Sequence, residues 1–262
     1  MNTAPLSVST LDVKVPGRQL VSALSFDVEE GEVLAVLGRN GSGKSLTLHT
    51  VAGLRDDESG EIRVGGIERD AIDGRDFARQ LALLPQHADD VFPGSVLETA
   101  ITGRYPHVST WSWETDEDLA ITRKALERMD LGGLVDRDVL TLSGGERRRL
   151  AIAQVLVQQP SVYVLDEPTN HLDPQHQIDV MRLFRALADD GRSVVVTLHD
   201  VNLAARFADR CLLLFGDGRW ELGETDTILT AEHLSELYAT PIKRIDADGR
   251  ALFVSAGLLD PA

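Results

Sequence analysis

The stretch GRNGSGKS at residues 38–45 fits the pattern G-x-x-x-x-G-K-S/T, which wraps nucleotide phosphates in many proteins. The apolar segment EVLAV at 32–36 precedes it, and the helix-like segment KSLTLHTVAGL follows from residue 44. A strand, a glycine-rich loop and a helix in this order form the setting that phosphate binding requires. We therefore predict a phosphate-binding loop composed of Gly38, Arg39, Asn40, Gly41, Ser42, Gly43, Lys44 and Ser45.

The residue types in this loop suit phosphate chemistry. Glycines at 38, 41 and 43 open backbone conformations closed to other residues, so that N–H groups can point at phosphate oxygens beside a helix N-terminus. Lys44 would place a full positive charge on the β and γ phosphates, and the Ser45 hydroxyl can coordinate Mg²⁺. A glycine-rich turn with a surface lysine is the alternative. The loop alone predicts that a nucleotide is bound. It does not indicate whether the nucleotide is hydrolysed or which process the hydrolysis would drive.

A second motif, SVYVLDEPT at 161–169, is an apolar strand that ends in two acids. Carboxylates at the C-terminal end of such a strand emerge where ligands lie in open α/β sheets. Asp166 is placed to hold Mg²⁺, usually through water, and Glu167 to polarise an attacking water. An ordinary acidic strand end or helix cap is the alternative for this motif taken alone.

The third motif is LSGGE at 142–146, which puts a hydroxyl and two glycines before the helix-like RRRLAIAQVL. It predicts a second helix N-terminus that can bind an anion. One triphosphate is not easily wrapped by both helix N-termini of one chain, so we expect LSGGE to meet the nucleotide of a second copy. A simple helix cap at Ser143 is the alternative.

Apolar runs of strand length alternate with helix-like segments, which favours a parallel sheet flanked by helices. The pairs are EVLAVLG with KSLTLHTVAGL, SVYVLDEP with residues 174–190, and SVVVTLH with DVNLAARFADR. Residues 87–160 hold helical stretches such as DEDLAITRKALERMD instead. We predict one domain, 1–262, in which a helical subdomain at 87–160 is inserted into an α/β nucleotide-binding core formed by 1–86 and 161–262.

The two ends of the chain complete this fold prediction. The first 30 or so residues, with GEIRVGG, are typical of β structure, and we expect an antiparallel β edge there. The GDG in CLLLFGDGRWELGE indicates a hairpin turn. The stretch TAEHLSELYA that follows predicts a short C-terminal helix.

Composition narrows the class of protein. With 43% hydrophobic residues in 262, the chain can bury a sizeable core. A formal net charge of −16 argues against a broad nucleic-acid footprint, although it leaves local basic patches such as Arg147, Arg148 and Arg149. The single Cys211 suits a reducing compartment, where we expect it to be a buried strand residue. No secretory leader or membrane span is predicted, so at a membrane the chain would be held by another subunit.

Taken in order, the motifs GRNGSGKS, LLPQ, LSGGE, VYVLDEP, NHLD and TLHD resemble those of the ATP-binding subunits of ABC transporters over nearly the whole chain. The resemblance implies a P-loop ABC-type ATPase. It assigns Gln86 as the residue that senses Mg²⁺ or the attacking water and links to the helical subdomain. It assigns Asp173 as an acid that communicates across a dimer, and His199 as a switch histidine that contacts the γ phosphate.

The resemblance also implies how ATP is bound. Two copies would face head to tail and enclose two ATP molecules. Each ATP would lie between the loop at 38–46 of one copy and Ser143, Gly144, Gly145 and Asp173 of the other. The two copies would close on ATP and part after hydrolysis, and this movement would be the mechanical stroke.

The catalytic roles follow from the same resemblance. Glu167 would align the attacking water, while His199 and Mg²⁺ would stabilise charge on the γ phosphate. The ion would be held by Ser45, Gln86 and Asp166. Catalytic residues are therefore expected to be Glu167, His199 and Gln86.

Two positions depart from the family pattern. An aromatic residue usually stacks on adenine near the start of the chain, but here the stretch is VKVPGRQL, with Val15 as the expected match. The residue after the loop serine is commonly Thr, but here it is Leu46, which removes a hydroxyl contact to the α phosphate.

This mechanical stroke needs a partner protein on which to act. Three features favour a transporter over related ATPases of DNA repair or translation: the acidic net charge, the lack of a long coiled-coil insertion, and a single nucleotide-binding domain. Integral membrane permease subunits would dock on the helical subdomain, which begins with HADDVFPGSVLETAITGRYPH at 87–107. The chain would then be peripheral on the cytoplasmic face of the inner membrane, and an extracytoplasmic substrate-binding protein would be an indirect partner.

Finer resemblance indicates importers of iron chelates and vitamin B12. The matching stretches are GRYPH at 103–107, TNHLDPQHQ at 169–177, HDVNLAARFADR at 199–210 and LYATPI at 237–242. Siderophore, haem and cobalamin all stay open as cargo, because the cargo would never touch this chain. The rival interpretation is a soluble ABC-type ATPase that scaffolds a cytosolic assembly, and co-purification with a membrane protein would distinguish the two.

Overall fold

A computed structural model describes residues 4–55, 59–86, 93–108, 113–247 and 250–256. Its centre is a sheet with the strand order β10-β9-β3-β8-β7-β6, in which β10 alone runs antiparallel to its neighbour. These strands are β3 (Val33–Leu37), β6 (Leu81–Leu84), β7 (Val162–Leu165), β8 (Ser193–Thr197), β9 (Arg210–Leu214) and β10 (Trp220–Glu224). Every residue of β3, β7 and β8 is buried, as expected of parallel strands covered on both faces.

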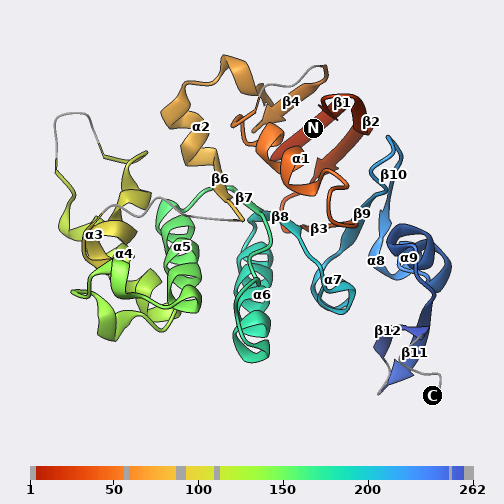
Figure 1. Ribbon diagram of the computed structural model, residues 1–262. Coiled ribbons are helices and arrows are strands. Elements are labelled where there is room, and N and C mark those ends of the chain that lie inside the picture. The colour runs from red at the N-terminus through yellow and green to blue at the C-terminus, as the bar shows by residue number, and fades with distance from the viewer. Residues whose placement is uncertain (1–3, 56–58, 87–92, 109–112, 248–249, 257–262) are drawn as a thin grey trace.

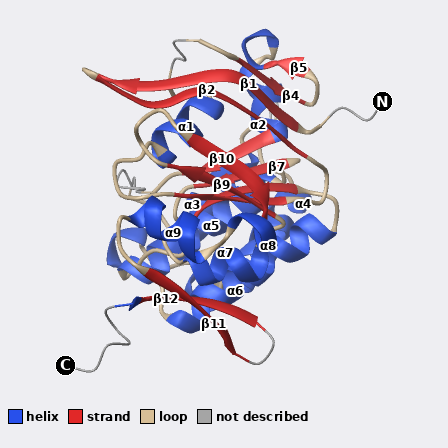
Figure 2. Cartoon of the chain, turned by 90° about the vertical axis from the view of Figure 1, so that its right-hand side faces the viewer, coloured by secondary structure: helices blue, strands red, loops and turns tan. Residues whose placement is uncertain are grey.

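The two faces of this sheet pack into two separate cores. Along β3, Val33, Ala35 and Leu37 join the core that the helices cover, whereas Leu34 and Val36 join the core under a second sheet. This alternation follows from the two-residue period of a strand. Figure 2 shows the resulting layers, with the second sheet on one side of the central sheet and most helices on the other.

The second sheet is antiparallel and forms the predicted β edge. Its order is β2-β1-β4-β5, from β1 (Leu6–Val15), β2 (Arg18–Val28), β4 (Glu61–Val64) and β5 (Ile67–Glu68). Helix α1 (Lys44–Val51) packs in the same core through Leu48 and Val51, so the helix that follows the glycine-rich loop is anchored between the two sheets. Helix α2 (Gly74–Gln80) then leads into β6.

Helices cover the other face. Helix α6 (Pro174–Asp189) follows β7, and α7 (Val201–Phe207) follows β8, as the alternating pattern predicted. Phe184 of α6 is fully buried and meets the ring of Tyr163 on β7 edge to face, with centroids 5.6 Å apart. This pair anchors α6 to β7, the strand that the acidic motif follows.

The regular elements in the described residues between β6 and β7 are all helices. Helices α3 (Val96–Ile101), α4 (Asp116–Arg128) and α5 (Gly144–Gln158) pack on one another, and Figure 1 places them to one side of the central sheet. Each begins with a capping box, in which the N-cap hydroxyl and the acid three residues later satisfy each other's backbone N–H. Helical structure here was predicted, and the limits of a subdomain at 87 and 160 stay a prediction.

The C-terminal part confirms two predictions and adds one element. Strands β9 and β10 form the hairpin expected at GDG, and α9 (Ala231–Tyr238), preceded by the short α8 (Thr225–Ile228), is the predicted helix. The hairpin of β11 (Ile242–Ala247) and β12 (Arg250–Ser255) was not predicted. It is fixed to α7 because the Asn202 side chain exchanges hydrogen bonds with the Phe253 backbone. None of the helices in the described residues is long and apolar enough to cross a membrane.

Candidate functional site

The glycine-rich loop lies between β3 and α1, as predicted. Gly41 and Gly43 have φ of 77° and 106°, a region that side chains disfavour. At Gly38 an added Cβ would lie 2.5 Å from both the Leu214 carbonyl oxygen and the Ser42 Oγ, so glycine is required there for space. The backbone is therefore free to turn its N–H groups toward a ligand.

Lys44 is buried at the start of α1, and its Nζ donates to the carbonyl oxygens of Gly38, at 2.9 Å, and Arg39, at 3.4 Å. Burial lowers the pKa of Lys44, while the charges of Glu167 and Asp166 act in the opposite sense. The ammonium group is thus held inside the loop beside two carboxylates.

A pocket of about 440 Å³ opens beside this loop. It combines loop residues with apolar residues of the second sheet and with Gln86 and Glu167. Its lining residues are Val15, Arg18, Leu20, Asn40, Gly41, Gly43, Lys44, Ser45, Leu46, Gln86 and Glu167. The structure therefore brings Gln86 and Glu167 to the phosphate loop. It also puts Val15 and Leu46, the two departures from the family pattern, in the same pocket.

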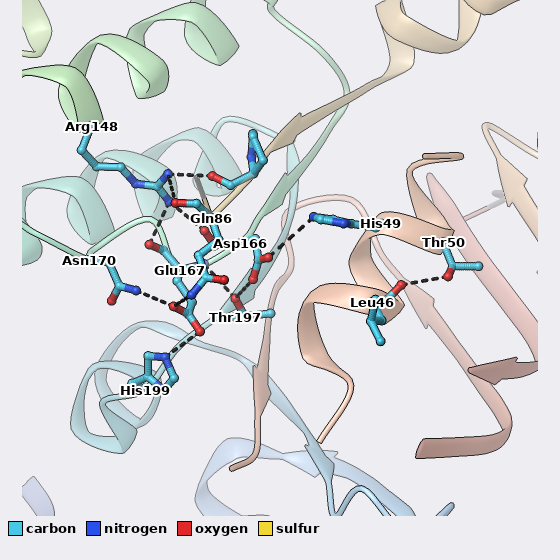
Figure 3. A network of polar contacts seen from close by, with 11 residues as sticks. Leu46, His49, Thr50, Gln86, Arg148, Asp166, Glu167, Asn170, Thr197 and His199 are labelled. Atoms are coloured by element: carbon cyan, nitrogen blue, oxygen red, sulfur yellow. Dashed lines mark hydrogen bonds and ion pairs between the residues drawn. The ribbon is translucent and has the colours of Figure 1, made fainter. Parts of the chain in front are cut away.

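Glu167 is the centre of a polar network (Figure 3). Its Oε2 accepts a hydrogen bond from Gln86 Nε2 at 2.6 Å and another from Asn170 Nδ2, and its Oε1 lies 2.6 Å from His199 Nε2. The Glu167 side chain is 5% exposed, whereas His199 is 43% exposed. Two of the predicted residues, Gln86 and His199, thus both contact the third, Glu167, although the three come from separate segments.

Asp166 is fully buried next to this network. Its Oδ1 accepts a hydrogen bond from Thr197 Oγ1 at 2.7 Å. Its Oδ2 lies 3.8 Å from His49 Nε2 and has no hydrogen-bond partner within the described part of the chain. A buried carboxylate oxygen without a partner is a costly arrangement that a cation or its water shell would relieve.

The donor set predicted for Mg²⁺ fits that ion. Ser45, Gln86 and Asp166 would offer a hydroxyl, an amide and a carboxylate oxygen, which are the hard ligands that Mg²⁺ prefers. Ser45 and Gln86 both line the pocket, and Asp166 precedes Glu167 in the chain.

The residues expected to meet a second ATP lie elsewhere. Ser143 caps α5, since its Oγ accepts from Glu146 N at 3.3 Å and Glu146 Oε2 accepts from Ser143 N at 2.7 Å. Asp173 caps α6 by accepting from His176 N at 3.0 Å, and its bonds to His176 lower its pKa. Neither residue, nor Gly144 or Gly145, is among the residues that line the pocket at the phosphate loop.

Four further residues of this site were missed from the sequence: His49, Arg148, Asn170 and Thr197. Arg148 was considered only as part of a local basic patch, and for this residue that idea is wrong. Its side chain is buried and donates to backbone carbonyls, because it shares a helix face with the buried Ile152 and Val155. The spacing i, i+4, i+7 with two apolar residues is the signal that was available.

Comparisons with known proteins agree with this geometry. Residues 21–170 match the ABC transporter family. A hemin import ATP-binding protein of Deinococcus radiodurans is 44% identical, with 80% of each chain covered. A cobalamin import ATP-binding protein of Halobacterium salinarum is 36% identical over 87% of this chain, which spans 57% of that protein.

Solved structures give the same result. A chain of a proposed metal-chelate type ABC transporter in an inward-facing conformation superposes with a TM-score of 0.82 at 30% identity, with 97% and 98% of the two chains covered. An ATP-binding cassette solved as a dimer in a post-hydrolysis state, bound to ADP and Pi, gives 0.73 at 25% identity, with 82% and 97% covered. With its phosphate loop, its acidic strand end and the network around Glu167, the chain belongs to the ABC transporter family, as an ATPase coupled to transport.

Proposed function

We propose that the chain is the ATP-hydrolysing subunit of a membrane importer for a metal chelate such as haem, cobalamin or a ferric siderophore. The observation that carries the ATPase part is the contact of Gln86, Glu167 and His199 beside the pocket of the phosphate loop. The names of the relatives, hemin and cobalamin importers, support the choice of cargo class.

The geometry supports a simple division of roles in hydrolysis. The Glu167 carboxylate takes a proton from the attacking water, whose oxygen bonds to the γ phosphorus as the bond to the leaving ADP oxygen breaks. Lys44 and His199 offer donors to the γ-phosphate oxygens. When bound, Mg²⁺ held by Ser45, Gln86 and Asp166 would neutralise charge on the β and γ phosphates. Gln86 and Asn170 keep the Glu167 carboxylate oriented toward the water.

Two copies would complete each site. Ser143 and Gly144 are exposed at the N-terminus of a 15-residue helix, where backbone N–H groups and the helix dipole favour an anion. Because they do not line the pocket of their own chain, the phosphates of a second copy are the proposed partner. The dimeric solved relative supports this arrangement.

The permease would dock on the helical segment. Tyr105 and Trp113 on this segment are 69% and 89% exposed, which is unusual for large aromatic side chains and typical of an interaction surface. Part of the stretch first considered for docking, 87–92, lies outside the described residues. The chain would sit on the cytoplasmic face of the membrane, and an extracytoplasmic binding protein would deliver the cargo to the permease.

Purification of the tagged full chain from cells solubilised in mild detergent tests this assignment. We expect a polytopic membrane protein to co-purify, and Tyr105→Glu to lose it while ATP binding is retained. Leu54→Glu is the matched control, because Leu54 is also 69% exposed but lies at the end of the α1 region. Recovery of soluble partners alone would instead favour a cytosolic scaffold. The binding protein paired with the permease can then be titrated with hemin, cobalamin and a ferric siderophore.

Arg18 is expected to contact the adenine that no aromatic residue holds. It lines the pocket with Val15 and Leu20, and its Nε and Nη2 both donate to the Gly216 carbonyl oxygen, at 3.1 and 2.6 Å, which fixes the plane of the guanidinium. A fixed guanidinium plane can stack on an aromatic base. Arg18→Ala should therefore weaken ATP binding about 3- to 30-fold by fluorescence titration, the range of a cation–π contact.

Arg18→Lys separates the two contributions of this side chain. It keeps the charge but loses the planar face and the paired bonds to Gly216, so it should restore only part of the affinity that alanine loses. An unchanged dissociation constant for Arg18→Ala would show that the base lies elsewhere.

A further inference from the structure

Glu167 has an uncommon backbone conformation. Its φ is 49°, in the left-handed region that residues with a Cβ rarely adopt. Such a conformation persists only where the surrounding structure holds it, and in enzymes it is often found at the site of chemistry. What holds this peptide unit therefore decides where the Glu167 carboxylate points.

Two side chains hold Glu167 from opposite sides. Its N–H donates to Thr197 Oγ1 at 2.8 Å, and its carbonyl oxygen accepts from Arg148 Nη2 at 2.8 Å. Thr197 Oγ1 also donates to Asp166 Oδ1 at 2.7 Å, so one hydroxyl fixes both acids of the strand end. Both residues are buried, which excludes water as an easy substitute.

Arg148 also joins two loops. Besides Glu167, it donates to the carbonyl oxygens of Asp166 at 2.7 Å and Pro168 at 3.3 Å. On the other side it donates to those of Pro85 at 2.7 Å and Gln86 at 3.3 Å. Five carbonyl oxygens from two segments thus meet one guanidinium, whose fixed fork no other side chain can reproduce.

Arg148 connects these loops to a helix N-terminus. Arg148 is on α5, whose first residues are those expected to meet the second ATP. Burial lowers its pKa to about 10, so it remains charged near neutral pH. Figure 3 shows Arg148 beside Gln86 and Glu167. Because its guanidinium bonds to the backbone of both residues, a shift of α5 would displace both.

We propose that Arg148 and Thr197 are positioning residues for ATP hydrolysis, which clamp the backbone of Glu167 and, through Arg148, tie it to Gln86 and to the helix that begins at Ser143. This inference rests on the role of Glu167 given under Proposed function. Neither residue touches ATP, so loss of the clamp should lower kcat and leave ATP affinity nearly unchanged.

Two matched pairs of variants test the clamp in the full chain, with kcat, KM and the dissociation constant of ATP measured for each. The first pair is Arg148→Lys and Arg104→Lys. Arg104 is likewise a buried arginine, bonded to Asp118, Val157 and Gln159 away from the pocket. The second pair is Thr197→Val, which removes only the hydroxyl function, and Thr197→Ser, which keeps it.

Arg148→Lys and Thr197→Val should lower kcat about tenfold or more, since small displacements of a catalytic group have effects of this size, and should change the dissociation constant less than about threefold. Arg104→Lys and Thr197→Ser should keep most of kcat. If Arg148→Lys does not fold, the Thr197 pair decides. Normal kcat in both Arg148→Lys and Thr197→Val would overturn the clamp if Glu167→Gln is inactive in the same assay. If Glu167→Gln is active as well, the role of Glu167 itself fails.

Discussion

Glu167→Gln is expected to stop ATP turnover while ATP stays bound. The amide has the shape of the carboxylate and can still meet Gln86 and His199, but it cannot accept a proton from water. Loss of a general base lowers a rate by about 10²–10⁴-fold. Phosphate release should therefore fall by that factor, and size-exclusion chromatography with ATP should show a trapped dimer.

Glu98→Gln is the matched control for this variant. Glu98 also accepts hydrogen bonds through its carboxylate, as the capping box of α3, but it does not line the pocket. The Glu98→Gln substitution removes the same charge from an exposed position, so ATP turnover should remain close to that of the parent chain. Turnover in Glu167→Gln within a few-fold of the parent would show that another group activates the water. Absence of a dimer with ATP would instead count against the proposed sandwich.

The parts of the site that lie within one segment could be predicted from the sequence. The loop at 38–45 is contiguous, and its shape depends on glycines whose positions are visible in the sequence. Asp166 and Glu167 follow a strand whose residues are all buried, so their place at the strand end follows from the apolar run before them. Local chemistry determines both features.

Contacts between distant segments could not be predicted in this way. Gln86 lies 81 residues from Glu167, and only the resemblance to a family singled it out, together with His199. Thr197 ends a β-branched run, SVVVT, in which it is indistinguishable from a core residue, yet it bonds both acids. Arg148 is the middle one of three consecutive arginines. Its burial depends on where α5 packs against two loops, which is a property of the tertiary structure.

The hairpin that was missed likewise depends on a contact between distant segments. Strand β11 is mostly exposed and β12 holds the short apolar run ALFV, so neither strand shows the alternation of apolar and polar residues that marks a half-buried strand. The position of the hairpin comes from Asn202, which pairs with the backbone of Phe253 across 51 residues. A side chain that replaces a strand neighbour in this way leaves no periodic signal.

Gly144→Asp is expected to abolish the ATP-dependent dimer and turnover without weakening the fold. Gly144 is exposed as the first residue of α5, and an added Cβ would meet nothing within 4 Å. An acidic side chain at a helix N-terminus stabilises the helix by about 0.3–1 kcal/mol, so the free energy of unfolding should not fall. Opposite the phosphates of a second copy, the same charge would repel and would cancel the field of the helix N-terminus. We expect turnover to drop about 10²-fold or more, as when a donor to developing charge is removed.

Gly133→Asp separates this effect from a general effect of charge. Gly133 is also exposed, and an added Cβ there would meet nothing within 4 Å. It lies in the same helical segment but outside LSGGE. It should leave both the dimer and turnover intact. In Gly144→Asp the dissociation constant of ATP for the monomer should also stay unchanged, because the residue does not line the pocket of its own chain. An ATP-dependent dimer of normal stability in this variant would mean that the N-terminus of α5 does not face the nucleotide of a second copy, and LSGGE would then be no more than a helix cap.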